Sequence, residues 1–408
     1  MGMFAIVVLA SLVAISGTAQ QTDLRREWID PDTGHRVVRL SDEPGSASLY
    51  FHQNAYTPDG EKLIITTPSG LSTINLKTRA IEKVVDGRVN IIMTGPKTGH
   101  VYYARAGTIY ATDLNNKATR EVVKLPPRGS IASVNADETL LAGIIDDGPP
   151  RPPQTPNAPR GDNYPGKGEM MERRLAERRP LQLITVDTRT GAVKTLLRGT
   201  DWYNHIQFSP TDPALLMFCH EGPWHKIDRT WTIRTDGTAL TKIHPRTMLM
   251  EIQGHEFFSG DGKMIWYDLQ TPKSQVFWLS GYNVTTAERI WYQLERSEWS
   301  VHFNVSPDGT LFAGDGGGPD SVAAPGNGQW IYLFRPKMVA DKTDGALSNA
   351  KDLIKPGYFK AEKLVNLAKH NYRLEPNVTF TPDQKWIVFR SNMLGPTHVF
   401  AVEVQKAK

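Results

Sequence analysis

Four histidines stand at or next to the starts of predicted strands, and they are the side chains of this chain best suited to acid–base chemistry. His52, His205, His255 and His302 each come a few residues before a tight turn. A neutral imidazole has an unperturbed pKa of about 6.5, so it can accept a proton near neutral pH. If the strands belong to successive repeats, these side chains converge on one pocket. The alternative is that each is a hydrogen-bonded structural residue.

Two further phrases could add charge to such a pocket. Arg229 precedes the strand that begins near Trp231, where it either forms a rim salt bridge or binds a carboxylate through two nitrogens. Glu375 and Asn377 precede the last repeat, and with His302 they offer nitrogen and oxygen ligands for Mn²⁺, Ca²⁺ or Mg²⁺. The sequence contains no HExxH or CxxC spacing, no nucleophile elbow and no P-loop.

The elements that would position these residues are repeated strands, each preceded by a turn of the form Ser/Thr-Pro-Asp-Gly. In such a turn Pro sets the first corner, Asp caps the turn with its side chain, and Gly accepts a positive φ. The spacing of the copies, roughly 40–75 residues, is typical of propeller blades with insertions. The predicted fold is therefore an all-β, seven-bladed propeller of four-stranded antiparallel blades. The copies begin at Thr57, Thr94, Asn135, Ser209, Ser259, Ser306 and Thr381.

Either end of the chain could close the ring: residues 399–404 would complete the first blade, or residues 37–40 the last. Residues 147–180 are predicted to be an insertion, with a Pro-rich loop followed by a charged helix at 168–179. The arginines of that helix form either a solvated face or a rim that steers anions. We expect irregular rim segments at residues 319–330 and 338–364.

Composition narrows the function classes. The net charge of +4 is mild and does not indicate nucleic-acid binding, and the single cysteine, Cys219, excludes an internal disulfide. Residues 1–19 are typical of a signal peptide, with an apolar run too short to span a bilayer comfortably and small residues before the cleavage point. No Lys or Arg precedes that run, which leaves an uncleaved anchor or a misplaced start as alternatives. We expect an exported protein, periplasmic or secreted, with one propeller domain at residues 20–408 and no membrane span after cleavage.

Several phrases together resemble the oligogalacturonate lyase family, which consists of seven-bladed propellers that act on short pectin fragments. The phrases are Phe-Cys-His-Glu-Gly-Pro at 218–223, His-Glu-Phe at 255–257, and the run from Asp308 to Gly316 that follows His302. The resemblance extends over about residues 30–404 and is weakest in the loops.

The resemblance implies that His255 is the catalytic base, that Arg229 works beside it, and that His302 ligates a metal ion. The implied reaction is β-elimination, in which a cation on the uronate carboxylate makes the C5 proton more acidic before the C4–O bond breaks. The expected partner is an acidic oligosaccharide. We expect three further histidines to bind it: His52, His205 and His220.

The metal shell departs from the family pattern, in which the other ligands are a glutamine and a His-Pro-His phrase. Here the phrase reads Glu375-Pro376-Asn377, and the glutamine position falls near Tyr372. The alternatives are a divalent ion held by Glu375 and Asn377, with Mn²⁺ preferred over Ca²⁺ or Mg²⁺, recruitment of His370, or loss of the metal. Two other functions stay open: a non-enzymatic periplasmic propeller that binds glycan or protein, and a lyase for a different uronic-acid glycan.

Overall fold

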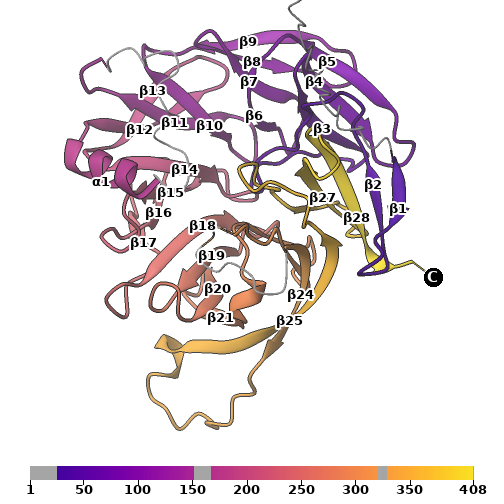
Figure 1. The fold of residues 1–408 in the computed structure, drawn as a ribbon. Helices are drawn as coiled ribbons and strands as arrows, with labels where there is room; N and C mark the ends of the chain where they lie inside the picture. Colours follow the sequence, from indigo (N-terminus) through magenta and orange to yellow (C-terminus); the bar gives the residue numbers. More distant parts are fainter. Residues whose placement is uncertain (1–24, 151–166, 320, 322–328, 408) are drawn as a thin grey trace, which may run out of the picture.

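The computed structural model describes residues 25–150, 167–319, 321 and 329–407. The predicted signal peptide, and residues 151–166 of the predicted insertion, lie outside this described part. The described chain consists almost entirely of antiparallel strands, and Figure 1 shows their sheets arranged around a common centre. No helix within the described ranges has the length and apolar content needed to cross a membrane.

The first four blades in chain order are separate sheets. One contains β3 (Lys62–Thr67), β4 (Gly70–Asn75) and β5 (Ile81–Asp86). The second contains β6 (Asn90–Thr94), β7 (Val101–Arg105), β8 (Thr108–Thr112) and β9 (Thr119–Lys124). The third contains β10 (Gly129–Val134), β11 (Leu140–Asp146), β12 (Leu181–Asp187) and β13 (Val193–Gly199). The fourth contains β14 (Trp202–Phe208), β15 (Leu215–Glu221), β16 (Thr230–Arg234) and β17 (Thr241–Lys242).

The fifth and sixth blades share one eight-stranded sheet. The fifth contains β18 (Ile252–Phe258), β19 (Met264–Gln270), β20 (Phe277–Asn283) and β21 (Arg289–Leu294). The sixth contains β22 (Phe303–Val305), β23 (Phe312–Gly314), β24 (Trp330–Met338) and β25 (Ile354–Asn366). The seventh contains β26 (Thr379–Phe380), β27 (Trp386–Ser391), β28 (His398–Lys406), β2 (His35–Arg39) and β1 (Glu27–Ile29). Two short 3₁₀ helices are η1 (Arg296–Glu298) and η2 (Ala350–Asp352).

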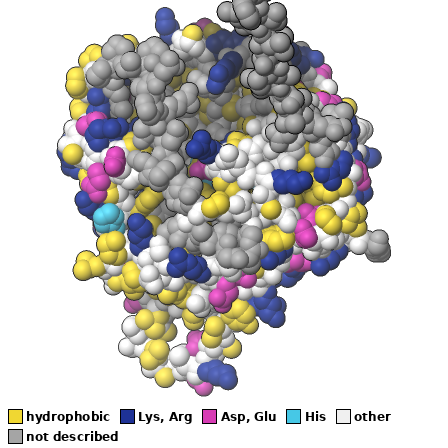
Figure 2. Space-filling view, in the orientation of Figure 1, with side chains coloured by type: hydrophobic (Ala, Val, Ile, Leu, Met, Phe, Trp, Pro, Cys, Tyr) yellow, Lys and Arg dark blue, Asp and Glu magenta, His cyan; other side chains and the backbone are white. Residues whose placement is uncertain are grey.

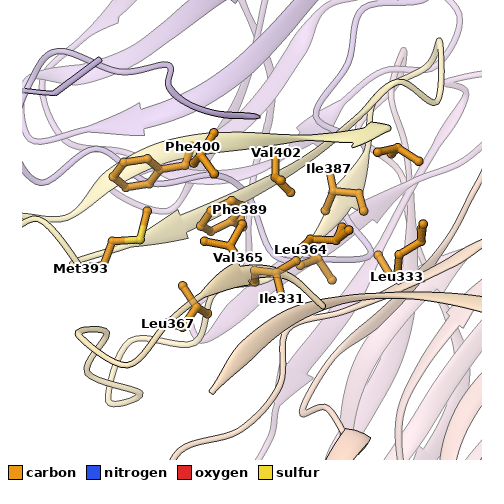
Figure 3. Close-up of a cluster of buried hydrophobic side chains, with 14 of the residues drawn as sticks. Ile331, Leu333, Leu364, Val365, Leu367, Ile387, Phe389, Met393, Phe400 and Val402 are labelled. Atoms are coloured by element: carbon orange, nitrogen blue, oxygen red, sulfur yellow. The ribbon is translucent and has the colours of Figure 1, made fainter. Parts of the chain in front are cut away.

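The ring closes through the N-terminal strand. β2 pairs antiparallel with β28, with Val37 opposite Val402, so the start of the chain completes the last blade. This confirms the second of the two closures considered from the sequence. Figure 3 shows the packing of this blade against its neighbour: Phe389 and Phe400 meet Ile331 and other aliphatic side chains of β24 and β25. Burying such side chains stabilises the blade junction by about 1.5–3 kcal/mol each.

The predicted turns are confirmed. Ser306 Oγ donates to Asp308 Oδ1 over 2.6 Å, and Gly309 has a φ of +73°. In the last blade Gln384 replaces the glycine and still adopts a φ of +60°. Each turn therefore joins the inner strand of a blade to its second strand. The inner histidines consequently lie at a fixed number of residues before their turns.

The expectation that residues 338–364 are irregular is wrong for their second half. β25 begins at Ile354, pairs antiparallel with β24, and also pairs in parallel with β21 of the preceding blade. Pro356, Gly357 and several lysines hid the pattern of this strand. The end of β24 and the first half of β25 form an arm in which several side chains are exposed. Figure 1 shows the β24–β25 arm extending away from the other sheets.

Helix α1 (Lys167–Glu177) lies in the connection between β11 and β12, within the predicted insertion. The arginines around its end have structural partners: Arg178 pairs with Asp201 at 3.1 Å and Arg179 with Asp146 at 2.7 Å. Figure 2 shows Lys and Arg side chains scattered over the visible face outside the grey atoms. This pairing favours the solvated-face interpretation over the anion-steering rim.

One blade lacks a regular inner strand. In the sheet of β3–β5 the inner position is taken by an irregular segment, joined to β3 by isolated bridges from Ala47 to Thr66 and from Tyr56 to Leu63. Between these bridges the chain turns through Tyr50, Phe51 and His52. Because this segment is not held in a regular strand, its aromatic side chains can contact the inner strands of other blades.

Candidate functional site

The inner strands of neighbouring blades place four polar residues at one equivalent position. His205, His255, His302 and Asn377 each lie four residues before the Ser or Thr that begins the turn of the blade. His205 and His255 both have a φ of +46°, and Asn377 has +56°. A non-glycine residue in this left-handed region costs free energy and is enriched at functional sites. His52 stands five residues before its turn, so it reaches the same region by a different route.

Four aromatic rings form a closed arrangement at this position, which we call the ring circuit: Tyr50, His205, His255 and His302. The centroid distances around it are 5.8 Å from Tyr50 to His205, 6.3 Å to His255, 4.8 Å to His302 and 5.1 Å back to Tyr50. Phe51 lies beneath, fully buried, with its ring 4.8 Å from that of His302. The convergence predicted for His205, His255 and His302 is thus found, with Tyr50 as an unforeseen member.

His52 packs on the circuit from the side. Its ring lies 5.0 Å from that of Tyr50 and 5.9 Å from that of His205. Burial, together with the neighbouring histidines, lowers the pKa of His52 well below its ordinary value. His52 is therefore a neutral hydrogen-bonding side chain at neutral pH, which suits contact with a sugar hydroxyl.

His255 is held by a buried carboxylate. Its Nδ1 lies 2.9 Å from Asp268 Oδ1 on β19, and Asp268 is almost fully buried. Gly254 permits this approach, because a Cβ there would lie only 3.0 Å from the same oxygen. Burial raises the pKa of Asp268 to about 7, although the charge of Arg229 opposes the rise. The bond fixes the ring and places the proton of a neutral imidazole on Nδ1, so Nε2 becomes the basic atom.

His302 is held in the same way on the next blade. Its Nδ1 lies 2.8 Å from Asp315 Oδ2, while its backbone N–H donates to Asp315 Oδ1 over 2.8 Å. The backbone N–H of Asn377 also donates to Asp315, so this carboxylate takes part in three hydrogen bonds. The other ring nitrogen, Nε2, lies 3.2 Å from the Tyr50 hydroxyl and 3.7 Å from Glu375 Oε2.

Arg229 lies below the circuit and is 3% exposed. Its Nη1 lies 2.6 Å from Glu221 Oε1, and its Nε lies 3.0 Å from Glu256 Oε2. Burial, the largest single effect, favours the neutral acid, but the charge and hydrogen bond of Arg229 together with the charge of His205 outweigh it and hold the pKa of Glu256 below its ordinary value. His205 borders this triad, with Nε2 3.9 Å from Glu221 Oε2. The guanidinium of Arg229 is therefore used mainly in ion pairs with Glu221 and Glu256.

Comparison with known proteins decides what kind of protein carries this arrangement. The profile of the oligogalacturonate lyase family matches residues 24–407, nearly the whole chain. The chain belongs to the oligogalacturonate lyase family. The resemblance and the lyase class inferred from the sequence are thereby confirmed.

Named members of the oligogalacturonate lyase family are similar over almost their full length. The oligogalacturonate lyase of Dickeya dadantii is 25% identical, with 92% of this chain and 95% of that protein covered. The oligogalacturonide lyase of Pectobacterium atrosepticum is 26% identical with the same coverage. A solved oligogalacturonate lyase in complex with manganese has a TM-score of 0.73 at 22% identity, covering 93% of this chain and 96% of that one. This last similarity confirms the propeller fold.

The residues that replace the family's metal ligands have other partners here. Asn377 Oδ1 accepts from the backbone N–H of Phe51 over 3.1 Å, and its Nδ2 donates to the carbonyl of Glu375. Within the described ranges no group of three or more His, Cys, Asp or Glu side chains is arranged to hold a metal ion. The donor set of this oligogalacturonate lyase family member thus reduces to His302 and Glu375.

His370 and Tyr372, the other positions considered for the metal, are also engaged. The ring nitrogens of His370 lie 2.9 Å from Ser391 Oγ and 2.6 Å from the carbonyl of Leu374. Burial lowers the pKa of His370 to about 4. The Tyr372 hydroxyl donates to the Asp315 carbonyl over 2.8 Å. Neither side chain reaches the Nε2 face of His302.

His220 lies apart from the ring circuit. Its ring stacks on Trp231 with centroids 5.3 Å apart and also contacts Tyr203 and Phe218. His220 is therefore placed by the structure between blade strands, and we leave it out of the proposed site.

Sequence reasoning missed three residues of the site, Tyr50, Asp268 and Asp315. A signal for the two aspartates was present, because each follows its histidine by 13 residues. Tyr50 carried no comparable signal, since it lies in the segment that replaces a strand.

Replacing Asp268 with Asn tests its positioning role. We expect Asp268→Asn to lower kcat by about 10- to 100-fold, because an amide no longer stabilises the imidazolium of His255. The melting temperature should not fall. Because the pKa of Asp268 is raised to about 7 in the folded state, this carboxyl lowers the free energy of unfolding as the pH rises from the ordinary pKa of an aspartate to about 7, and the amide removes that effect. Rate and melting curves on one preparation check both parts; a lower melting temperature with unchanged kcat would contradict them.

Proposed function

We propose that this chain cleaves short 4-linked galacturonate chains by β-elimination at the ring circuit, leaving a 4,5-unsaturated uronate end. The observation that carries the proposal is the His255–Asp268 pair. It provides an oriented base within the ring circuit, in a chain that belongs to the oligogalacturonate lyase family. No paired catalytic carboxylates are required, because the reaction consumes no water.

The proposed reaction begins at C5 of the uronate, whose proton is weakly acidic because it lies alpha to the carboxylate. His255 Nε2 takes this proton, and the charge of Asp268 stabilises the imidazolium that forms. The electron pair of the C5–H bond forms the C4–C5 double bond as the C4–O4 bond breaks. The leaving O4 needs a proton, and the Tyr50 hydroxyl supplies it from the opposite side of the circuit. The proton on His255 later returns to Tyr50 through solvent.

Arg229 contributes from below in this scheme. With Nε and Nη1 paired to Glu256 and Glu221, it holds those two carboxylates and bounds the His205 side of the circuit. We propose that His205 and His52 contact sugar hydroxyls. The neutralisation of the substrate carboxylate then requires another cation.

A tightly held metal ion does not fit the side chains present. The solved relative described with manganese makes Mn²⁺ the first ion to test, with Ca²⁺ and Mg²⁺ next. At His302, however, Nε2 lies 3.7 Å from Glu375 Oε2, and the Tyr50 hydroxyl already occupies the Nε2 face. In the part of the chain that the structure describes, no group of three or more His, Cys, Asp or Glu side chains is arranged to hold an ion. Two protein ligands would leave most of the coordination shell to water, so we route no step through a metal.

Removing divalent ions should therefore change the rate little. We expect exhaustive chelation to lower kcat by less than about threefold, because a two-ligand site holds an ion weakly. Glu375→Ala should respond to chelator in the same way as the wild type. The check is the steady-state rate before and after chelation, with metal content measured in parallel. A loss that Mn²⁺ restores, and that Glu375→Ala abolishes, would contradict this expectation and identify a working metal site.

The products give a direct test of the reaction type. In water enriched in ¹⁸O, mass spectrometry of trigalacturonate products should show no incorporated oxygen and an unsaturated end. Incorporated ¹⁸O would indicate hydrolysis and end the proposal. Turnover of a different uronide alone would keep the elimination and change the substrate.

We also propose that the protein is exported and that its mature part is the single propeller. The support is the apolar run followed by small residues within 1–19. The mass of the protein recovered from its host would show shortening near residue 20, and an intact chain would contradict cleavage. An acidic oligosaccharide in that compartment is the proposed partner.

A further inference from the structure

Arg390 occupies, on the last blade, the position that holds the two aspartates on the blades before it. Asp268 follows His255 by 13 residues, Asp315 follows His302 by 13, and Arg390 follows Asn377 by 13. Asp268 and Arg390 stand on the second strands of their blades, β19 and β27, and Asp315 directly follows β23, the second strand of its blade. Where two neighbouring blades present a carboxylate behind a histidine, this blade presents a guanidinium behind an asparagine.

The guanidinium is anchored between the two segments that surround His302. Arg390 Nε donates to the carbonyl of Glu375 over 2.8 Å, and Nη1 donates to the carbonyl of Ser48 over 3.3 Å. Glu375 approaches His302, and Ser48 lies two residues before Tyr50, whose hydroxyl bonds the same imidazole. Two backbone carbonyls, which carry no formal charge, thus fix the group next to the ring circuit.

No carboxylate in the described part of the chain forms an ion pair with Arg390. Glu375 and Asp315 act on it only from beyond ion-pair distance, and Asp315 already accepts three bonds around His302. Burial lowers the pKa of Arg390. A largely buried cation without an anionic partner is unfavourable, whereas a guanidinium binds a carboxylate strongly through two parallel hydrogen bonds. Arg229, by contrast, already has two glutamate partners.

We propose that Arg390 binds the carboxylate of the uronate that loses its C5 proton, and so supplies the positive charge that a metal ion would otherwise provide. This rests on the function proposed above and specifies how that site recognises its substrate. Arg390 forms and breaks no covalent bond. It lowers the free energy of the transition state, in which charge from the C5–H bond spreads onto the carboxylate.

Binding measurements in an inactive background test the proposal. In His255→Ala, the added Arg390→Met change should weaken trigalacturonate binding by about 30-fold or more, because the ligand carboxylate loses its charged partner. The fully methyl-esterified trisaccharide carries no negative charge, so its Kd should not change. Arg390→Lys keeps the positive charge but loses the paired N–H donors of the guanidinium, so its Kd for trigalacturonate should lie between those of the parent and Arg390→Met. Arg335→Met on the exposed β24–β25 arm is the matched control and should bind both ligands as the parent does.

The outcomes separate the proposals. Equal affinity for trigalacturonate with and without Arg390, or an equal loss for acid and ester, would overturn the role of Arg390. A variant that has lost its fold would show no cooperative melting, and Arg390→Lys then serves as the test. Wild-type protein that forms no unsaturated product from any uronide would instead remove the proposed function, whatever Arg390 does to binding.

Discussion

Replacing His255 with Ala should abolish elimination, with kcat on trigalacturonate falling by about a thousandfold or more. The Nδ1 of His255 is held by the buried carboxylate of Asp268 on the adjacent strand, whereas the Nε2 of His302 already lies 3.2 Å from the Tyr50 hydroxyl. We expect neither His205, which borders Glu221, nor His302, which bonds Tyr50, to take the C5 proton in its place. The check is the initial rate of unsaturated product formation.

The fold should survive this change, since His255 is part of a bulged strand edge and alanine tolerates the space left. We expect the melting temperature of His255→Ala to match that of the control His100→Ala, which alters a histidine in a remote turn. Residual activity above about a tenth of wild type would point to another base. In the wild type, kcat/KM should rise with pH as the His255–Asp268 pair loses its proton, because the base must be unprotonated to act. The raised pKa of Asp268, about 7, places part of that rise near neutrality.

Tyr50→Phe should lower kcat on trigalacturonate by about 100-fold, because the leaving O4 would then depart without a proton. The Tyr50 hydroxyl lies 3.2 Å from His302 Nε2. In the ring circuit, Tyr50 and His255 both lie next to His205 and His302. Tyr50 and His255 therefore lie on opposite sides of the circuit, an arrangement that suits an acid and a base acting on adjacent carbons of one sugar. The measurement is kcat under saturating substrate.

A substrate with an activated leaving group distinguishes proton donation from a structural role for Tyr50. A uronate that carries a nitrophenyl ether at C4 releases a stable phenolate, so Tyr50→Phe should process it at nearly the wild-type rate. His255→Ala should fail on both substrates. Tyr56→Phe is the matched control, because its buried hydroxyl bonds Thr379 at a blade junction. If Tyr50→Phe lowers kcat by the same factor on both substrates, Tyr50 is not the proton donor.

The fold was readable from the sequence because its signal is local and repeated. A turn such as Ser306 to Gly309 is specified by four residues, and its copies reveal the blade period without any knowledge of distant contacts. The closure was left open, since both chain ends have strand-forming sequences and only pairing in space decides between them. Strand β25 was missed because Pro356, Gly357 and its lysines interrupt the alternation of apolar and polar residues that marks a strand.

The site was predicted only where it follows the repeat. His205, His255 and His302 stand at one position relative to their turns, so their convergence follows from the blade geometry. Tyr50 comes from a segment where the inner strand is absent, and no periodic signal marks it. The direction of His220 depends on the side of β15 that it occupies, and the backbone N–H of Phe51, which bonds the Asn377 side chain, lies on another blade. Both were therefore beyond sequence reasoning.

The most direct test of the central claim is the ultraviolet absorbance of the conjugated uronate, followed while chelator-treated wild-type protein acts on trigalacturonate. We expect the absorbance to rise in proportion to enzyme concentration and to be absent with His255→Ala. No rise on this or any other uronide, together with measurable binding of the oligosaccharide, would contradict the lyase mechanism and favour a propeller that binds glycans without cleaving them.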